Sequence, residues 1–175
     1  MTRFEGDSAL VVHVPEAEPV VGEWRLMLDP AADHGVDAHI TVLFPFVSSS
    51  DLDDDVLGRI AAVAAGCDPF DLSLVEVRWF ERDVVYLAPQ PEEPFRDLTA
   101  AVWAEFPEHP PYQGAHDDPI PHLTIGQGGP LDDMRRAADA VDERLPIRGR
   151  AAALDLIVLE AAVWAQRARF PLGGE

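Results

Sequence analysis

Short apolar stretches along the chain follow the pattern of β-strands. They are rich in Val, Leu, Ile and Phe and are bounded by Pro, Gly or charged residues. A charged triplet at 81–83 separates two of them and predicts a hairpin. The predicted strands cover residues 8–14, 38–46, 70–80, 84–88, 122–127, 151–161 and 162–170.

Between several of these strands, apolar residues recur every three or four positions, which predicts amphipathic helices. The clearest pattern covers residues 92–106, after an acidic start. Asp53, Asp54 and Asp55 begin another helix, and we interpret them as capping and solvated residues rather than as metal ligands. The remaining predicted helices cover residues 21–28, 52–64 and 131–145.

The order strand, helix, strand, strand occurs twice, over residues 38–88 and 122–170. The two segments share this order without sharing an identical sequence, which indicates a diverged internal duplication. The chain has 175 residues, of which 47% are hydrophobic, so it can bury a sizeable core. We therefore expect a single bilobal domain over residues 1–175.

Each predicted copy begins with a histidine and a threonine separated by one apolar residue. The first copy has His39 and Thr41, and the second has His122 and Thr124. The whole chain contains only six His and four Thr, so two such triplets at equivalent positions are not expected by chance. Side chains two positions apart on a strand share one face. If the two motif strands pack side by side, two imidazoles and two hydroxyls meet in one cleft.

Two imidazoles on either side of a phosphorus atom can carry out in-line phosphoryl chemistry without a metal ion. A neutral imidazole takes a proton from the attacking oxygen, and a protonated one gives a proton to the leaving oxygen. Each transfer contributes roughly 10²–10⁴-fold in rate, which suits a substrate already activated by ring strain. The motif residues therefore favour the opening of a 2′,3′-cyclic phosphate, or its reverse.

With these motifs the chain resembles the two-histidine (2H) phosphoesterases, and within them the bacterial 2′-5′ RNA ligase-like branch. The resemblance is carried by AHITVLFPF at 38–46 and PHLTIGQ at 121–127, and the order of elements extends it over nearly the whole chain. It implies a bilobal α+β fold of two antiparallel β-sheets with outer helices around a central cleft and a pseudo-two-fold internal repeat. It also implies an enzyme that hydrolyses cyclic phosphodiesters on nucleotides or RNA ends, or joins 2′-5′ links reversibly, without ATP, metal or another cofactor.

The resemblance makes His39 and His122 the acid and base pair and makes Thr41 and Thr124 the ligands of the phosphate oxygens. For hydrolysis we assign His122 to activation of water and His39 to protonation of the leaving ribose oxygen, and the roles exchange in ligation. Tyr112, in a Pro-rich loop before the second motif, is our candidate for contact with the substrate base. The alternative is a loop aromatic packed on its neighbouring prolines.

The charge of the chain limits its partners. All 13 cationic residues are Arg, none is Lys, and 32 acidic residues bring the formal net charge to −19. The absence of Lys excludes a lysine nucleophile or Schiff base. The negative charge argues against long duplex nucleic acid and favours a nucleotide-sized cyclic phosphate or a short RNA end.

The cellular setting is predicted from the cysteine and from the N-terminal segment. Cys67 has no second cysteine to pair with, which fits a reducing compartment. The first apolar run, residues 9–12, is too short for a signal sequence or a membrane span. We expect a cytoplasmic monomer with no membrane contact. The tryptophans, which we interpret as core or lobe-interface residues, are Trp24, Trp79, Trp103 and Trp164.

Two other functions stay open. One is a nucleotide or RNA-end binding module without catalysis, although such a module would not need a second titrating group. The other is a metal-dependent hydrolase that uses His34, Asp37 and His39 with carboxylates of the Pro-rich loop. That loop contains His116 and Asp117, but neither set has a regular ligand spacing.

Overall fold

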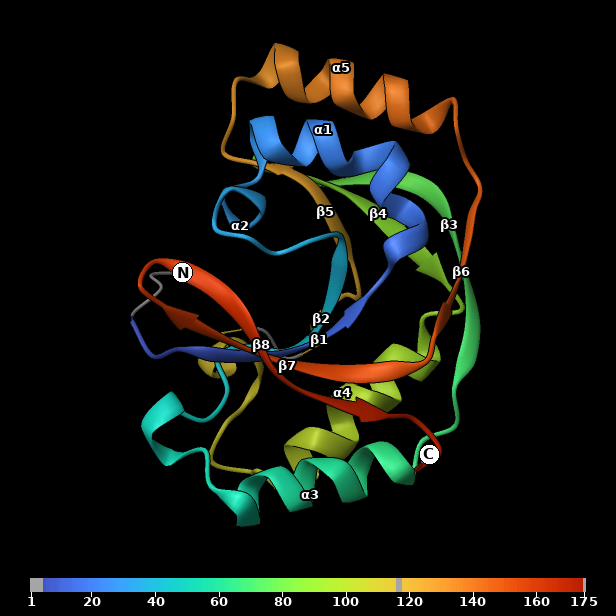
Figure 1. The fold of residues 1–175 in the computed structure, drawn as a ribbon. Helices are drawn as coiled ribbons and strands as arrows, with labels where there is room; N and C mark the ends of the chain where they lie inside the picture. The colour runs from blue at the N-terminus through green and yellow to red at the C-terminus, as the bar shows by residue number, and fades with distance from the viewer. Residues whose placement is uncertain (1–4, 116–117, 175) are drawn as a thin grey trace.

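The computed structural model describes residues 5–115 and 118–174. Over this part of the chain the strands form two four-stranded antiparallel sheets, in the orders β2-β1-β7-β8 and β5-β4-β3-β6 (Figure 1). The strands are β1 (Ser8–His13), β2 (His39–Leu43), β3 (Phe70–Phe80), β4 (Val84–Gln90), β5 (Leu123–Gln127), β6 (Ile147–Ala151), β7 (Ala153–Glu160) and β8 (Val163–Pro171).

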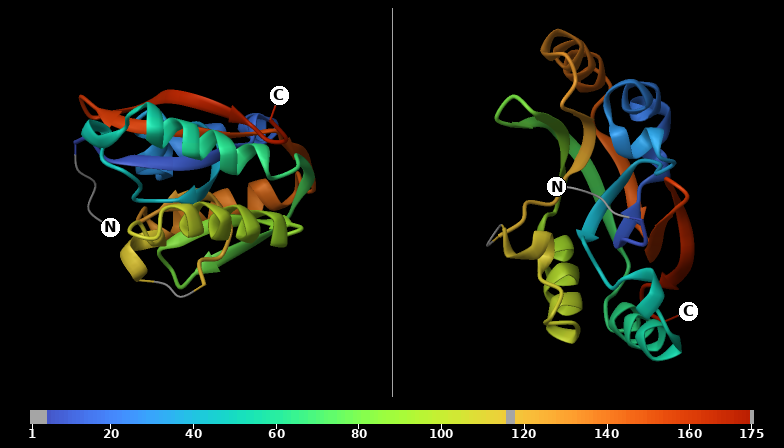
Figure 2. Two further views of the ribbon diagram at one scale, coloured as in Figure 1. Left: turned by 90° about the horizontal axis from the view of Figure 1, so that it is seen from below. Right: turned by 90° about the vertical axis from the view of Figure 1, so that its left-hand side faces the viewer.

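The helices lie on the outer faces of the two sheets. Helices α1 and α5 contact each other and β5 at one end of the molecule, whereas α3 and α4 lie together at the other end, against β8 and β2 (Figure 1 and Figure 2). The helices are α1 (Glu18–Leu28), α2 (Pro30–Asp33), α3 (Asp54–Ala65), α4 (Glu93–Glu105) and α5 (Leu131–Asp142), and the 3₁₀ turns are η1 (Pro15–Ala17), η2 (Ser49–Asp51) and η3 (Pro111–Gly114). The predicted α+β fold with outer helices is confirmed.

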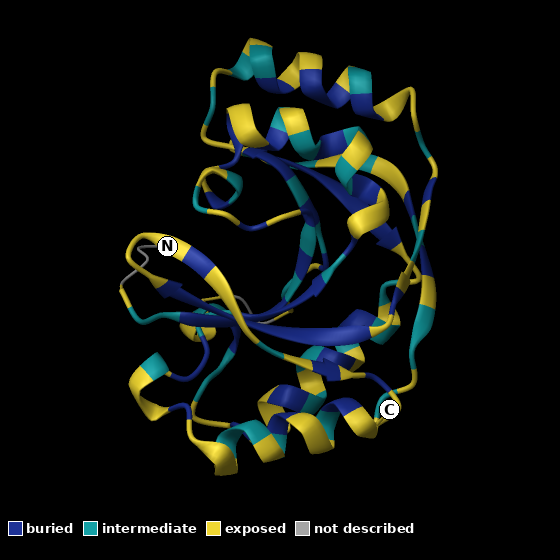
Figure 3. Ribbon diagram, viewed as in Figure 1, coloured by how far each residue is buried: buried dark blue, intermediate teal, exposed yellow. Residues whose placement is uncertain are grey.

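Burial follows the predicted periodicity. The central strands are largely buried, and the helices expose their outer faces (Figure 3). In α4 the buried residues Phe95, Leu98 and Val102 lie on the predicted apolar face. At the start of α3, Asp53 caps the helix by accepting a hydrogen bond from the N–H of Val56 at 2.9 Å, as the sequence predicted.

The two motif strands occupy matching positions. β2 and β5 are each the edge strand of their sheet, and they contact each other where the sheets meet. Thr41 pairs with Val11 of β1, and Thr124 pairs with Tyr86 of β4. In both pairs the register shifts immediately before the partner residue, and such irregularities redirect side chains. Apart from the short helix α2, the order strand, helix, strand, helix occurs as β1–α1–β2–α3 and as β4–α4–β5–α5, so each structural repeat begins one strand and one helix before the copies predicted at 38–88 and 122–170.

Two predictions from the sequence were wrong. We expected no strand between the helix ending at Pro146 and residue 151, yet β6 lies there and pairs with β3. β6 lacks the usual apolar alternation because Gly149 and two exposed arginines occupy its centre. Trp103 is 42% exposed rather than buried, because it lies on the solvent side of α4. Among the described residues no helix is long and apolar enough to cross a membrane.

Candidate active site

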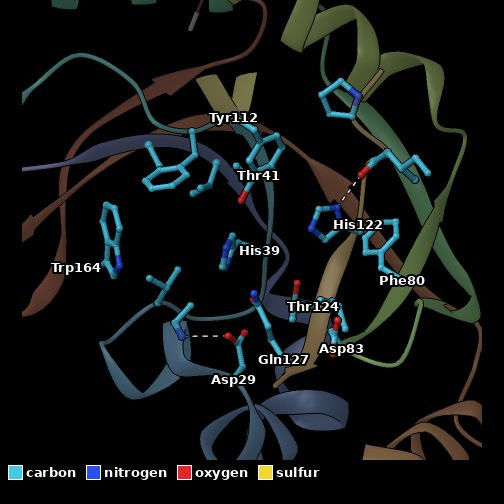
Figure 4. Close-up of a pocket in the computed structure, with 18 of the residues that line it drawn as sticks. Asp29, His39, Thr41, Phe80, Asp83, Tyr112, His122, Thr124, Gln127 and Trp164 are labelled. Atoms are coloured by element: carbon cyan, nitrogen blue, oxygen red, sulfur yellow. Dashed lines mark hydrogen bonds between the residues drawn. The ribbon is translucent and has the colours of Figure 1, made fainter. Parts of the chain in front are cut away.

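A cleft of about 750 Å³ lies between the two sheets and contains every site residue predicted from the sequence (Figure 4). β2 and β5 border it, because the alternation of each strand buries one set of side chains and turns the other set toward the cleft. The predicted site residues that line it are His39, Thr41, Tyr112, His122 and Thr124.

The two histidines are held in the same way. His39 donates from Nδ1 to the carbonyl of Asp37 at 2.8 Å, and His122 donates from Nδ1 to the carbonyl of Ile120 at 2.7 Å. In each case the partner lies two residues earlier in the chain. Because a backbone carbonyl can only accept, Nδ1 must carry the proton in this arrangement. Nε2 of each neutral imidazole is then free to accept a proton from a substrate.

The surroundings lower the pKa of both imidazoles. Burial lowers the pKa of His39 to about 3, with the positive charge of Arg25 as the next cause, whereas the bond to the Asp37 carbonyl acts in the opposite direction. Burial also lowers the pKa of His122, against the Ile120 carbonyl and the negative charge of Asp29. Both rings line the same cleft, and charge on His122 adds to the lowering of the pKa of His39.

Aromatic rings fix His122 on the side of the β3–β4 hairpin. Phe80 and Tyr86 stack with their centroids 4.2 Å apart. The His122 ring meets both edge to face, with centroid distances of 5.2 Å to Phe80 and 5.6 Å to Tyr86. His39 has a different neighbour, the imidazole of His13, at a centroid distance of 6.4 Å.

The threonines and Tyr112 complete the predicted set. Thr41 and Thr124 are half-buried and point into the same space as the histidines (Figure 4). Tyr112 lies beside Thr41 at the edge of the cleft, in a left-handed conformation with φ of 52°. Its N–H donates to the carbonyl of Phe44 at 2.7 Å, which ties the Pro-rich loop to the end of β2.

An apolar wall on the His39 side was missed in the sequence. Trp164 and Phe44 meet edge to face at 6.1 Å and, with Val11 and Ile157, belong to a second hydrophobic cluster that faces the cleft. Trp164 was expected in the core or at the lobe interface, and it is buried but also lines the cleft. No motif marks these residues, because apolar residues of a strand look alike whether they face the core or a cleft.

Charged and amide side chains at the rim were also missed. Gln127, at the end of β5, points toward the space between the histidines (Figure 4). None of the described residues that line the cleft is Arg. The acidic residues that line it are Asp29, Glu81, Asp83 and Asp118.

Those residues considered for a metal site that the structure describes do not form one. His34 donates from Nδ1 to the carbonyl of Ala162 at 2.8 Å. Within residues 5–115 and 118–174, no group of three or more His, Cys, Asp or Glu side chains is arranged to hold a metal ion. His116 and Asp117 lie outside the described residues.

Several solved structures of other proteins share this fold. The structure of LigT from E. coli in complex with 3′-AMP matches with a TM-score of 0.62 and 16% identity, covering 97% of this chain and 99% of that one. LigT in complex with ATP matches with a TM-score of 0.57 and 16% identity, over 95% and 97% of the two chains. TT0787 of Thermus thermophilus matches with a TM-score of 0.58 and 17% identity, over 97% and 99%. No curated protein sequence matches significantly.

The family follows from the sequence itself. Residues 13–162, which include both His-x-Thr motifs and the whole β5-β4-β3-β6 sheet, match the model of the 2′-5′ RNA ligase superfamily. This match confirms the resemblance to the 2H phosphoesterases that the two motifs indicated. The chain therefore belongs to the 2′-5′ RNA ligase superfamily.

Proposed function

We propose that this protein opens 2′,3′-cyclic phosphates on nucleotides or short RNA ends, or forms 2′-5′ phosphodiester links in the reverse direction, by acid–base catalysis. The observation that carries the proposal is the matched geometry of His39 and His122. Each donates Nδ1–H to a carbonyl two residues earlier and presents Nε2 to the same cleft. General acid–base catalysis of in-line displacement needs two such nitrogens, one for each exchanged proton.

The hydroxyls of Thr41 and Thr124 are the proposed donors to the non-bridging phosphate oxygens. They come from strands of different sheets, so they approach the phosphate from two sides. The amide of Gln127 is a third candidate donor. Donors arranged around a phosphate before it arrives stabilise the charge that develops in the transition state.

The charge of the cleft supports a small substrate. The reacting phosphate meets histidines and hydroxyls, whereas each further phosphate of an extended RNA would approach a rim with acidic residues such as Asp83 and Asp118. The apolar wall formed by Trp164 and Phe44 gives a nucleobase a surface for stacking, and Tyr112 is a second candidate. The complexes of LigT with 3′-AMP and with ATP support a nucleotide-sized ligand.

The test is hydrolysis of 2′,3′-cyclic mononucleotides and of a short RNA with a cyclic phosphate end, after treatment with chelator. We expect His39→Ala and His122→Ala each to lower kcat by about 10²–10⁴-fold. His34→Ala is the matched control, because His34 lies outside the cleft and bonds a backbone carbonyl. It should keep kcat within about threefold of the parent, given that general acid–base effects are much larger.

Each alternative function has its own outcome. Loss of activity with chelator, together with loss in His34→Ala, would replace this proposal by a metal-dependent hydrolase. Binding of a cyclic nucleotide or of 3′-AMP without turnover by the parent would replace it by a binding module. The single thiol of Cys67 further supports action of the protein in the reducing cytoplasm.

A further inference from the structure

A buried ion pair at the end of α1 borders the cleft that contains both motif histidines. Arg25 is 1% exposed and Asp29 is 4% exposed. Arg25 donates from Nε and Nη2 to Oδ2 of Asp29, at 3.2 and 3.0 Å. Oδ1 of Asp29 accepts the N–H of Ala31 at 3.0 Å, so both carboxylate oxygens are bonded. Nothing in the chemistry proposed above uses this pair.

The two ends of the pair face different parts of the site. Nη1 of Arg25 donates to the carbonyl of Val36 at 2.9 Å, in the segment that leads directly into His39. Asp29 instead lines the cleft, on the same side as Gln127 (Figure 4). A buried charge is costly unless it is paired and hydrogen-bonded. The bonds to Val36 and Ala31 therefore hold this pair in one orientation. Its positive end is therefore bonded to the segment that precedes His39, and its negative end lies at the cleft surface.

The two other imidazoles near His39 act on its pKa in the same direction as Arg25, whereas the bond to the Asp37 carbonyl acts against them. His13, the register partner of His39 on β1, faces it at 6.4 Å and donates from Nδ1 to the buried carboxylate of Asp155. His122 faces it from the residue immediately before β5. The charges of Arg25, His13 and His122 each add to the effect of burial in lowering the pKa of His39.

The surroundings of His122 differ. Phe80 and Tyr86 enclose its ring without contributing a cation. Burial lowers the pKa of His122, but the negative charge of Asp29 acts against that change. The other acidic residues that line the cleft are Glu81, Asp83 and Asp118. The protonated state is therefore favoured on His122 over His39.

We infer that the Arg25–Asp29 pair sets the direction of proton transfer, so that in ring opening His39 is the base and His122 is the acid. This inference rests on the proposed function and reverses the roles that we assigned from the sequence. Arg25 and Asp29 are positioning residues, because they act through the histidines.

The step balances with water as the only other reactant. The water oxygen forms a bond to phosphorus while its proton passes to Nε2 of His39. The bond from phosphorus to the ribose oxygen breaks while that oxygen takes the proton from Nε2 of His122. The product is a phosphomonoester, and exchange with water returns one proton to His122 and removes one from His39.

A substrate that needs no acid separates the two roles. A deoxynucleoside 3′-(4-nitrophenyl phosphate) has no 2′-hydroxyl, and its nitrophenolate leaves without a proton. We expect His122→Ala to keep activity on this ester within about tenfold of the parent while losing about 10²–10⁴-fold on the cyclic phosphate. His39→Ala should lose activity on both. The opposite pattern, with the ester cleaved by His39→Ala and not by His122→Ala, would overturn the inference.

A second measurement tests the ion pair itself without the ester. NMR titration of the imidazole carbons should show the pKa of His39 raised by about one unit in Arg25→Gln, with a smaller change at His122. Arg25→Lys, which keeps the charge, should restore the parent value. Arg150→Gln is the control, because Arg150 pairs with Asp71 on an exposed surface and does not line the cleft.

The kcat/KM of Arg25→Gln also distinguishes whether His39 is the base or the acid. If His39 is the base, raising its pKa makes it a slightly stronger base and changes the maximal kcat/KM by no more than about threefold. If His39 were the acid, the active enzyme would be the minor form that carries its proton on His39 and not on His122. The fraction of this form would rise about tenfold for each unit by which the pKa of His39 approaches that of His122. A rise of about tenfold in kcat/KM, or a His39 pKa that moves in His13→Gln and not in Arg25→Gln, would overturn the inference. Failure of the parent to open cyclic phosphates would instead overturn the proposed function.

Discussion

Gly126 lies where α1 packs against the strand that carries the second motif. An ideal Cβ at this buried position would lie 2.9 Å from Cβ of Leu28 and 3.5 Å from Cγ1 of Val85. Cβ of Leu28 cannot move away without its backbone, and the next residue, Asp29, lines the cleft. We therefore expect Gly126→Ala to push the end of α1 away from β5 and to lower both stability and activity.

The magnitude follows from a comparison with Gly58→Ala in α3, where an added Cβ meets nothing within 4 Å. Both substitutions reduce the freedom of the unfolded chain, a gain of about 0.4–1 kcal/mol that largely cancels in the difference. The steric cost of an overpacked core remains, at about 1–3 kcal/mol. For a domain of this size that cost corresponds to a difference in Tm of roughly 2–12 °C.

Gly129→Ala provides an intermediate case. Its added Cβ would lie 3.0 Å from Cδ2 of Leu28, which is the end of a flexible side chain and can rotate away. Urea unfolding followed by circular dichroism should rank the variants Gly58→Ala, Gly129→Ala and Gly126→Ala in order of falling free energy of unfolding. Equal values for Gly58→Ala and Gly126→Ala would refute the close approach of α1 to β5.

Three further predictions concern the cleft. Thr41→Val and Thr124→Val keep the shape of the side chain and remove the hydroxyl, so each should lower kcat by about 10²–10³-fold on the cyclic phosphate; unchanged kcat would exclude the hydroxyl as a phosphate ligand. Because the pKa of His39 is lowered to about 3, the unfolded chain binds a proton that the folded protein does not, and stability should fall by about 1 kcal/mol per unit as the pH drops from about 6 to about 4. In His39→Gln the free energy of unfolding should depend less on pH over this range. A slope equal to that of the parent would contradict the lowered pKa of His39. Trp164→Leu should raise KM by about tenfold with little change in kcat if the base stacks there, as steady-state kinetics would show.

The positions of the motif residues could be predicted because strands impose a strict period of two. The buried residues Ile40 and Val42 identify the core face of β2, so His39 and Thr41 had to face the other way. In the same way, the buried residues Leu123 and Ile125 identify the core face of β5, so His122 and Thr124 had to face the other way. The repeated motif then supplied the long-range information, because two equivalent strands related by a pseudo-two-fold axis bring their equivalent faces together.

The wall and the rim of the cleft could not be predicted in this way. Trp164 and Phe44 are far apart in the sequence, and their contact depends on how β8 and β2 curve within one sheet. Arg25 has the sequence context of a surface residue on an amphipathic helix, yet it is fully buried. Its burial depends on Asp29 one turn later and on the carbonyl of Val36, and a local pattern does not reveal such a partner.

The sequence predicted a symmetric pair of histidines but not their separate roles, because the difference between the two halves lies at the helix ends. In each half of the fold, one helix contacts the motif strand of the other half. Thr99 of α4 donates a hydrogen bond to the carbonyl of Val42 in β2. Leu28 of α1 packs on Gly126 of β5. The buried residue after α4 is Phe106, whereas the end of α1 carries the Arg25–Asp29 pair. Symmetric backbones therefore hold the two imidazoles in like geometry, and the charge at the end of one helix makes them chemically unequal.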